Sequence, residues 1–193
     1  MIILSIDPGP ETSGSCLYDT EARRVLWSSS DIDNYELRQY VYDQAYYDPD
    51  ESVKNSPPAR YYDAVAIETI EPMGLGVGKS TLDTAIWVGR YYESVKSSPR
   101  ELSVELISRG DEKIILCGCK TFIDPVTGKR KGVTNAQIRQ AVIDRFEPSG
   151  GGKRPQIGTK KQPGPLYGVS SHAWSAVAIA LTYEEQFING KTV

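Results

Sequence analysis

The chain has 193 residues, of which 39% are hydrophobic, which is enough to bury one good core but not two comfortable ones. Its net charge of −3 gives no overall preference for a polyanion, and its apolar runs are too short to span a bilayer. The odd number of cysteines, three, leaves no second pair of ligands to close a zinc site. We therefore expect a single domain over residues 1–193, without a secretory signal, in a reduced, cytoplasmic setting.

The first strands are predicted from apolar runs and turns. Residues 2–7 are apolar and are followed by Pro8-Gly9-Pro10, which predicts a buried strand that enters a turn. Residues 15–18 and 24–28 flank a polar turn and predict a hairpin antiparallel to the first strand. These three strands are expected to form a meander, followed by a helix over residues 35–47.

An inserted loop and a second strand follow. Residues 48–60 are polar, contain three prolines and lack periodicity, which is typical of an exposed loop. Residues 63–68 form an apolar strand that ends on a carboxylate, Glu68. A helix is predicted from Ser80 or Thr81 to about Val95. Its buried side is expected to consist of Leu82, Ala85, Ile86, Val88 and Gly89.

The second half continues the alternation of strands and helices. Residues 103–107 predict a buried strand and residues 111–116 a short helix. An insertion at about 119–133 resembles a hairpin, and residues 135–146 form an amphipathic helix.

A glycine-rich connector precedes the last predicted helix. Residues 149–152 are expected to be a flexible connector, and residues 153–165 are basic and rich in Pro and Gly. The last helix is predicted over residues 171–187.

Two of the predicted strands end on carboxylates, Asp7 and Glu68. Because the carboxyl ends of neighbouring strands in an open α/β sheet meet at one edge, the two side chains are expected to share a site. Adjacent carboxylates repel unless one is protonated or a cation lies between them, and hard oxygen ligands suit Mg²⁺ or Mn²⁺. The alternative is that Asp7, standing before Pro-Gly, only forms a turn.

Three segments, in the right order, resemble one known family. Ile6-Asp7-Pro8-Gly9, followed by Thr12 and Gly14, resembles the first catalytic motif of RuvC-type Holliday junction resolvases. Residues 66–68 are similar to the second motif, and residues 171–180 to the final helix that carries the last metal ligands. The resemblance spans nearly the whole chain.

The resemblance is closest to the phage-type branch, through residues 158–161 and 163–168. It implies an α/β, ribonuclease H-like (retroviral integrase superfamily) fold with a mixed five-stranded sheet, an antiparallel meander followed by parallel strands, flanked by helices. It also implies an endonuclease that cleaves Holliday junctions or other branched DNA with two Mg²⁺ or Mn²⁺ ions. A homodimer acting on a four-way junction in a bacterial or phage-infected cell is expected, without a membrane partner.

The last motif departs from the family pattern. The final helix of the family usually offers two acids three residues apart, whereas this chain has His172 and Ser175 there. Some relatives have histidine at the first position, so the resemblance implies Asp7, Glu68 and His172 as catalytic residues and metal ligands. Ser175 cannot replace the charge of a carboxylate, and its replacement by Asp is expected to raise activity if that charge is limiting.

Basic residues are concentrated in residues 113–161, which hold 11 Lys and Arg against 3 Asp and Glu. Such a segment is either a solvated surface or one that follows a phosphate backbone. The positions expected to contact DNA are Lys79, Lys113, Lys120, Lys129, Arg130, Lys131, Lys160 and Lys161. Lys79 belongs to a glycine-rich stretch, 74–81, that fails the P-loop pattern at Met73, where glycine is required.

Two other functions remain open from the sequence. The same fold class hosts ribonucleases, so cleavage of RNA–DNA hybrids is a second enzyme hypothesis. The replacement of the last acid by Ser175 also allows a junction-binding protein with weak or lost catalysis.

Overall fold

The computed structural model describes residues 1–43, 61–71, 76–98 and 101–192. The loop predicted over residues 48–60 lies outside the described residues.

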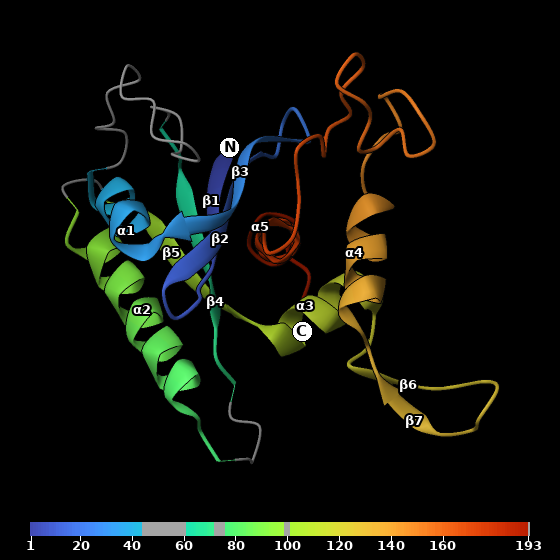
Figure 1. The fold of residues 1–193 in the computed structure, drawn as a ribbon, viewed down its shortest axis with the longest axis horizontal. Coiled ribbons are helices and arrows are strands. Elements are labelled where there is room, and N and C mark those ends of the chain that lie inside the picture. Colours follow the sequence, from blue (N-terminus) through green and yellow to red (C-terminus); the bar gives the residue numbers. More distant parts are fainter. Residues whose placement is uncertain (44–60, 72–75, 99–100, 193) are drawn as a thin grey trace.

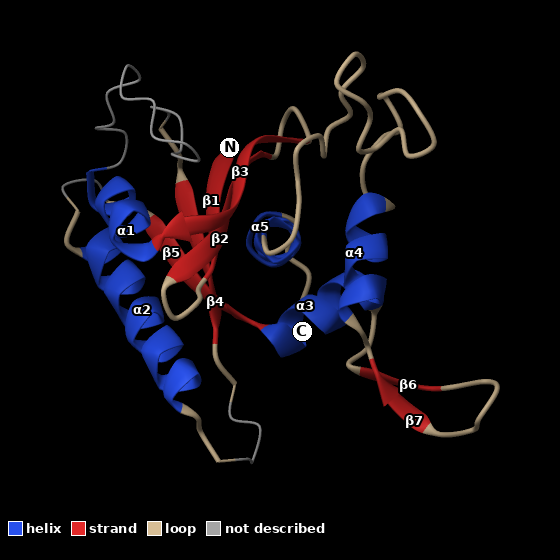
Figure 2. Cartoon of the chain, viewed as in Figure 1, coloured by secondary structure: helices blue, strands red, loops and turns tan. Residues whose placement is uncertain are grey.

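A five-stranded mixed sheet forms the centre of the fold, with strand order β3-β2-β1-β4-β5 (Figures 1 and 2). β1 pairs antiparallel with β2, and β2 with β3, whereas β1–β4 and β4–β5 are parallel. The strands are β1 (Ile2–Asp7), β2 (Thr12–Asp19), β3 (Arg24–Asp33), β4 (Ala64–Thr69) and β5 (Ser103–Ser108). The predicted meander followed by parallel strands is confirmed.

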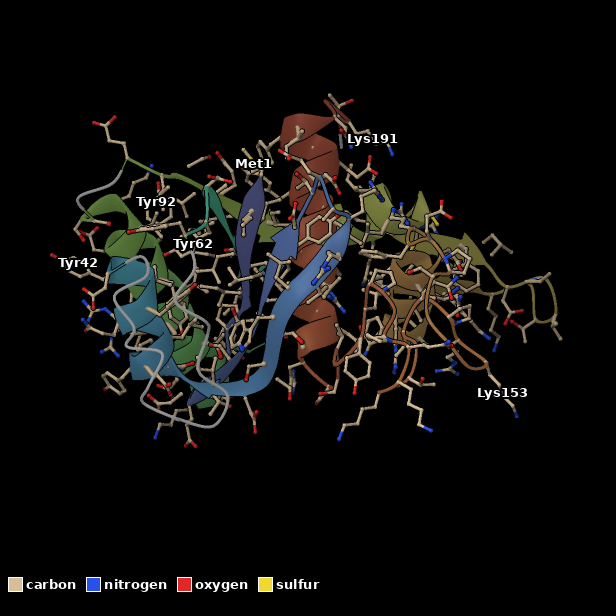
Figure 3. The ribbon with its side chains drawn as sticks, turned by 90° about the horizontal axis from the view of Figure 1, so that it is seen from above. Met1, Tyr42, Tyr62, Tyr92, Lys153 and Lys191 are labelled. Atoms are coloured by element: carbon tan, nitrogen blue, oxygen red, sulfur yellow. The ribbon has the colours of Figure 1, made fainter. Side chains whose placement is uncertain are left out.

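Helices cover both faces of this sheet. α1 and α2 lie on one face, while α5 lies on the other with α3 and α4 beyond it, as Figures 1 and 3 show from two directions. The helices are α1 (Asn34–Asp43), α2 (Lys79–Lys96), α3 (Arg109–Cys117), α4 (Asn135–Ile143) and α5 (Ala173–Tyr183). α5 continues into a π-helical turn, Glu184–Ile188. The predicted insertion is a small hairpin of β6 (Thr121–Ile123) and β7 (Arg130–Gly132).

α5 is the central helix of the molecule. Every residue of it except Ser175 is buried, as expected for a helix that is hydrophobic all round. The Ser5 hydroxyl of β1 donates a 2.6 Å hydrogen bond to the carbonyl of Ala176. This bond joins the first strand to the first turn of α5. It therefore fixes the position of the start of α5 relative to the end of β1.

The buried side predicted for α2 is confirmed only at Val88 and is wrong at the other four positions. Leu82 and Ile86 are 55% and 52% exposed, and Ala85 and Gly89 are also exposed. The residues that α2 buries are Trp87, Val88, Tyr91, Ser94 and Val95. The large aromatic rings fill the space against α1 and the sheet, so the helix turns its aliphatic stripe toward solvent.

The segment predicted as a flexible connector is instead a compact loop. The amide of Gly150 donates to the carbonyl of Pro155 at 2.7 Å, and that of Gly151 to the carbonyl of Gln162 at 2.9 Å. A Cβ atom on Gly150 would lie 2.7 Å from backbone atoms of Gly158, so glycine allows the loop to close on itself. The glycines therefore serve close backbone packing.

α4 is shorter than predicted, because it ends at Ile143, ahead of the Glu147-Pro148 step. The first helix is described to Asp43, and the rest of its predicted range lies outside the described residues. Among the described residues, no helix combines the length and the apolar character needed to cross a membrane.

Candidate active site

Asp7 and Glu68 meet at the carboxyl edge of the sheet, as predicted. Asp7 is the last residue of β1, and Glu68 is the second-last residue of the parallel neighbour β4. Their carboxyl groups are joined by a side-chain hydrogen bond. The sheet topology thus brings two acids 61 positions apart into one site.

Burial controls the ionisation of this pair. It raises the pKa of Glu68 to about 8, and the hydrogen bond and the charge of Asp7 act in the same direction. The pKa of Asp7 is raised as well, chiefly by burial, although the hydrogen bond from Glu68 opposes the shift. The pair therefore retains a proton more readily than two exposed carboxyl groups would, and a cation placed between the two groups would displace it.

The start of α5 contributes His172 and Ser175. Nδ1 of His172 lies 3.6 Å from Oδ2 of Asp7, and the Ser175 side chain forms a hydrogen bond with Asp7 that favours its ionised form. The imidazole is 73% exposed, so it is reachable from solvent. All three predicted catalytic residues are thus gathered at one place.

Gly14 allows this approach. It pairs with Asp7 across β1 and β2, and a Cβ atom at this position would lie 2.7 Å from the carbonyl oxygen of His172. Such contacts do not occur in real structures, so the backbone of His172 reaches the sheet only because residue 14 has no side chain.

An arginine–glutamate pair that the sequence reasoning did not find completes the site. Ser108 ends β5 and caps α3 through a capping box with Asp111. The first turn of α3 carries Arg109 and Glu112, whose side chains form an ion pair. Nη2 of Arg109 also donates a 2.6 Å hydrogen bond to Oδ1 of Asn135 in α4. A charged i,i+3 pair directly after a predicted strand was the available signal.

Glu112 is the most buried acid of the site. Its side chain is 0% exposed, and one of its oxygens, Oε1, is the buried polar side-chain atom without a hydrogen-bond partner in the described structure. Burial raises the pKa of Glu112 to about 8, with the charge of Glu68 acting in the same direction. The charge of Glu112 in turn raises the pKa of Asp7. The pKa values of the three carboxyl groups are therefore linked through their charges.

Three pockets converge on these residues. The largest, about 690 Å³, is lined by Asp7, Glu68 and Arg109, among others. A second, of about 310 Å³, lies on the side of Asp7 that faces His172. A third, of about 370 Å³, is lined by Arg109, His172 and Ser175. Thr84 of α2, which the sequence reasoning also missed, lines the first two.

The donor set fits a hard divalent cation, although it is not arranged as a finished metal site. No group of three or more His, Cys, Asp or Glu side chains in the described part of the chain has the geometry to hold a metal ion. The donors at hand are the carboxylates of Asp7 and Glu68, the His172 imidazole and the unpartnered Oε1 of Glu112. Oxygen-rich sets of this kind suit Mg²⁺ and Mn²⁺.

The predicted DNA-contacting residues are spread over several surfaces. Lys113 and Lys120 line the largest pocket, and Lys120 lies 4.0 Å from Glu71 at its rim. Lys79 begins α2, whose N-terminus has no side-chain cap. These three stand at or near the carboxyl edge of the sheet.

The other basic residues lie further away. Lys129, Arg130 and Lys131 belong to the β6–β7 hairpin, where Lys131 pairs with Asp124. Lys160 and Lys161 are on the loop between α4 and α5, which lies at the upper right of Figure 1, whereas the hairpin lies at the lower right. That loop is fixed to β3 by a 2.9 Å bond from the Val25 amide to the Pro165 carbonyl. None of these five lines the three pockets.

Comparison with known proteins gives matches only at the level of structure. No family model matches the sequence, and no curated protein sequence is significantly similar to it. The chain is similar in structure to Thermus thermophilus RuvC, with a TM-score of 0.52 and 20% identity over 99% of this chain and 98% of that one. It is also similar to T. thermophilus RuvC in complex with a Holliday junction substrate, with a TM-score of 0.52 and 18% identity over 98% of this chain and 96% of that one. The expected ribonuclease H-like fold is thereby confirmed.

Proposed function

We propose that this protein is a RuvC-type, metal-dependent endonuclease that cleaves Holliday junctions or other branched DNA. The observation that carries the proposal is the meeting of Asp7, Glu68 and His172 at the carboxyl edge of the sheet. The full-length structural similarity to RuvC, which in one structure is bound to a Holliday junction, supports the same substrate class here.

Asp7, Glu68 and His172 would hold the divalent ions, which we take to be two Mg²⁺ or Mn²⁺. When bound, such ions stabilise the negative charge that develops on a phosphate during hydrolysis. The chain contributes the fixed position of the donors, because β1 is tied to α5 through Ser5 and Gly14. Burial raises the pKa of Asp7, and the hydrogen bond from Ser175 opposes this shift by favouring the ionised form, which is the form that binds a cation.

The surroundings of the site match a phosphate backbone in charge. Lys113 and Lys120 line the pocket that contains the carboxylates, and the uncapped N-terminus of α2 with Lys79 offers free amides nearby. The β6–β7 hairpin and the loop with Lys160 and Lys161 would extend the contact along the arms of a junction.

The exposed stripe of α2 supports a homodimer. Leu82, Ala85, Ile86 and Gly89 form a continuous aliphatic face on one helix, with Val77, 63% exposed, ahead of its N-terminus. Exposed apolar surfaces of this kind mark interaction sites, and the small Gly89 permits a helix from a second copy to approach closely. A symmetric dimer would present two sites to the symmetric strands of a four-way junction.

A junction-binding protein with weak or lost catalysis is the second candidate. Ser175 stands where an acid is expected, and the described donors do not form a finished metal group. This candidate predicts tight junction binding with little cleavage at any metal concentration.

One experiment separates these functions and the hybrid ribonuclease. The protein and an Asp7→Asn variant are incubated with labelled four-way junction, linear duplex and RNA–DNA hybrid, with Mg²⁺, Mn²⁺ or EDTA. Paired metal-dependent nicks in the junction, lost in the variant, are expected. Binding without nicking would replace the proposal by the junction-binding function, and cleavage of the hybrid alone by a ribonuclease.

A further inference from the structure

We propose that Glu112 supplies the carboxylate that Ser175 does not, as an additional ligand of the divalent-cation site, with Arg109 as its counter-ion before the cation binds. The inference rests on the proposed function, because it concerns the cation that this function requires. It assigns a role to a residue on α3, a helix that carries none of the predicted catalytic residues.

The position of Glu112 follows from the order of the strands. β1, β4 and β5 are consecutive and parallel in the sheet, and Glu68 lies opposite Ile107 of β5. α3 begins two residues later, so its first turn lies beside the end of β4. The charge of Glu68 raises the pKa of Glu112, and the charge of Glu112 raises the pKa of Asp7, so the three groups lie near one another. The ends of β1 and β4 and the first turn of α3 therefore each carry one acid at the same edge of the sheet.

The unpartnered oxygen of Glu112 is the second observation. Oε2 is bound by Arg109, whereas Oε1 is buried without a hydrogen-bond partner. An unsatisfied buried oxygen on an ionisable group carries a free-energy cost, and most buried polar atoms avoid this cost. A cation coordinated by Oε1 removes the cost, which gives the orphaned atom a function.

The charge count of the site agrees with this role. A two-ion site in this fold class is expected to use several acids, yet the start of α5 offers only His172 and Ser175. Glu112 restores the missing negative charge from a different helix. Arg109 is 24% exposed, so its guanidinium can turn toward solvent or toward a DNA phosphate when a cation takes over Glu112.

Direct cation binding, measured without DNA and without catalysis, tests the role. Mn²⁺ affinity is determined by calorimetry for the wild type, Asp7→Asn, Glu112→Gln and Glu184→Gln. Glu184 is the matched control, because it is also a buried acid that faces an arginine, Arg23 at 3.7 Å, and belongs to the π-helical turn that follows α5. Glu112→Gln is expected to weaken Mn²⁺ binding by about 10-fold or more, and Glu184→Gln to leave it unchanged.

A rescue variant tests whether the charge is the one missing at Ser175. In the Glu112→Gln background, Ser175→Asp is expected to restore most of the Mn²⁺ affinity. The gain should be larger than the gain from Ser175→Asp in the wild type, because the wild type already has the carboxylate of Glu112. Equal gains in both backgrounds would contradict the proposal.

A charge-neutral variant covers the case in which Glu112→Gln does not fold. Arg109→Met combined with Glu112→Leu removes both halves of the buried pair and leaves no unpaired charge, a replacement that proteins often tolerate. Because this double variant leaves the net charge of the protein unchanged, a loss of Mn²⁺ affinity would come from the loss of the Glu112 carboxylate as a ligand. Wild-type affinity in this variant or in Glu112→Gln would show that the pair only fastens α3 to α4 through Asn135.

The outcomes for Asp7 separate this inference from the proposed function. If Asp7→Asn abolishes Mn²⁺ binding and Glu112→Gln does not weaken it, the inference alone is wrong. If Asp7→Asn binds Mn²⁺ as the wild type does, the metal site of the proposed function is itself wrong.

Discussion

Nδ1 of His172 lies 3.6 Å from Oδ2 of Asp7, which joins the start of α5 to the end of β1 at the edge where Glu68 stands. His172 is the sole histidine of the chain, and its side chain is 73% exposed. An exposed imidazole contributes little to the core, so its loss should affect chemistry more than folding.

We therefore expect His172→Ala to reduce single-turnover cleavage of a four-way junction by about 100-fold, with junction affinity within a few-fold of the wild type. His172→Asp should recover part of the rate, because a carboxylate is also a suitable ligand. Gel-based cleavage and binding assays measure the two quantities. Equal rates for His172→Ala and the wild type would remove His172 from the catalytic set.

The stability of the metal-free protein should fall as the pH rises. The pKa of Glu68 is raised to about 8, well above the value of about 4.5 for an exposed glutamate. Between those values the folded state binds more protons than the unfolded state, so stability is full below pH 4.5 and is lost as the pH rises through 8. Melting in EDTA from pH 5 to pH 8.5 should show a loss of roughly 2–3 kcal/mol, or about 5–10 °C.

Saturating Mg²⁺ or Mn²⁺ should flatten this dependence, because the cation favours the ionised carboxylates. Glu68→Gln, which cannot ionise, should show a smaller loss in EDTA. A metal-free melting temperature that rises across the same pH interval would contradict the raised pKa values.

Gly14→Ala should displace the start of α5. The added Cβ would lie 2.7 Å from the carbonyl oxygen of His172, so either the strand or the helix must move. We expect a loss of about 1–3 kcal/mol in the free energy of unfolding and a larger loss of cleavage than of junction binding. Gly132→Ala, which has open space around its Cβ position, is the control for stability in the same thermal melts.

The basic residues around the pocket should carry much of the electrostatic contact with DNA. Replacing Lys113 and Lys120 together by alanine should weaken junction binding and reduce the slope of log affinity against log salt by about 1–2. Lys160 and Lys161, on the loop fixed to β3, should have a smaller effect because they do not line the pockets at Asp7.

The control for these variants is Lys191→Ala, a lysine that pairs with Glu185 near the C-terminus (Figure 3). Its salt dependence should equal that of the wild type. An unchanged slope in the Lys113 and Lys120 double variant would exclude the pocket from backbone contact.

A charge on the exposed stripe of α2 should prevent self-association. Ile86 is 52% exposed and lies one turn after Leu82, so Ile86→Asp places a charge in the middle of the proposed dimer interface. Sedimentation velocity should show a dimer for the wild type and a monomer for the variant. Ser80→Asp adds the same charge to an exposed position at the start of the helix, on the side away from the stripe, and should remain dimeric.

The exposed stripe also shows what periodicity cannot decide. The spacing of Leu82, Ile86 and Gly89 correctly predicted a helix, because helical periodicity is local. It did not predict which side would be buried, since Trp87 and Tyr91 offered a competing face. Packing against α1 and the sheet decided in favour of the aromatic face.

The sequence by itself determined the order of strands and helices and two acids of the site. Asp7 and Glu68 each end a short apolar run, and because parallel strands share a carboxyl edge the sequence predicts that the two acids lie together. His172 and Ser175 were placed by resemblance, since a lone histidine near a helix start carries no local signal of its own.

Only the tertiary structure decided the role of α3 and of the glycine-rich loop. Arg109 and Glu112 look in sequence like a solvent-exposed i,i+3 pair, yet Glu112 is fully buried and its partner Arg109 is bound to Asn135 of α4. The glycines at 150 and 158 look like a flexible linker, yet they permit backbone contacts across the loop. The burial of a side chain and the close approach of two backbone segments depend on residues distant along the chain. Local sequence patterns therefore do not predict them.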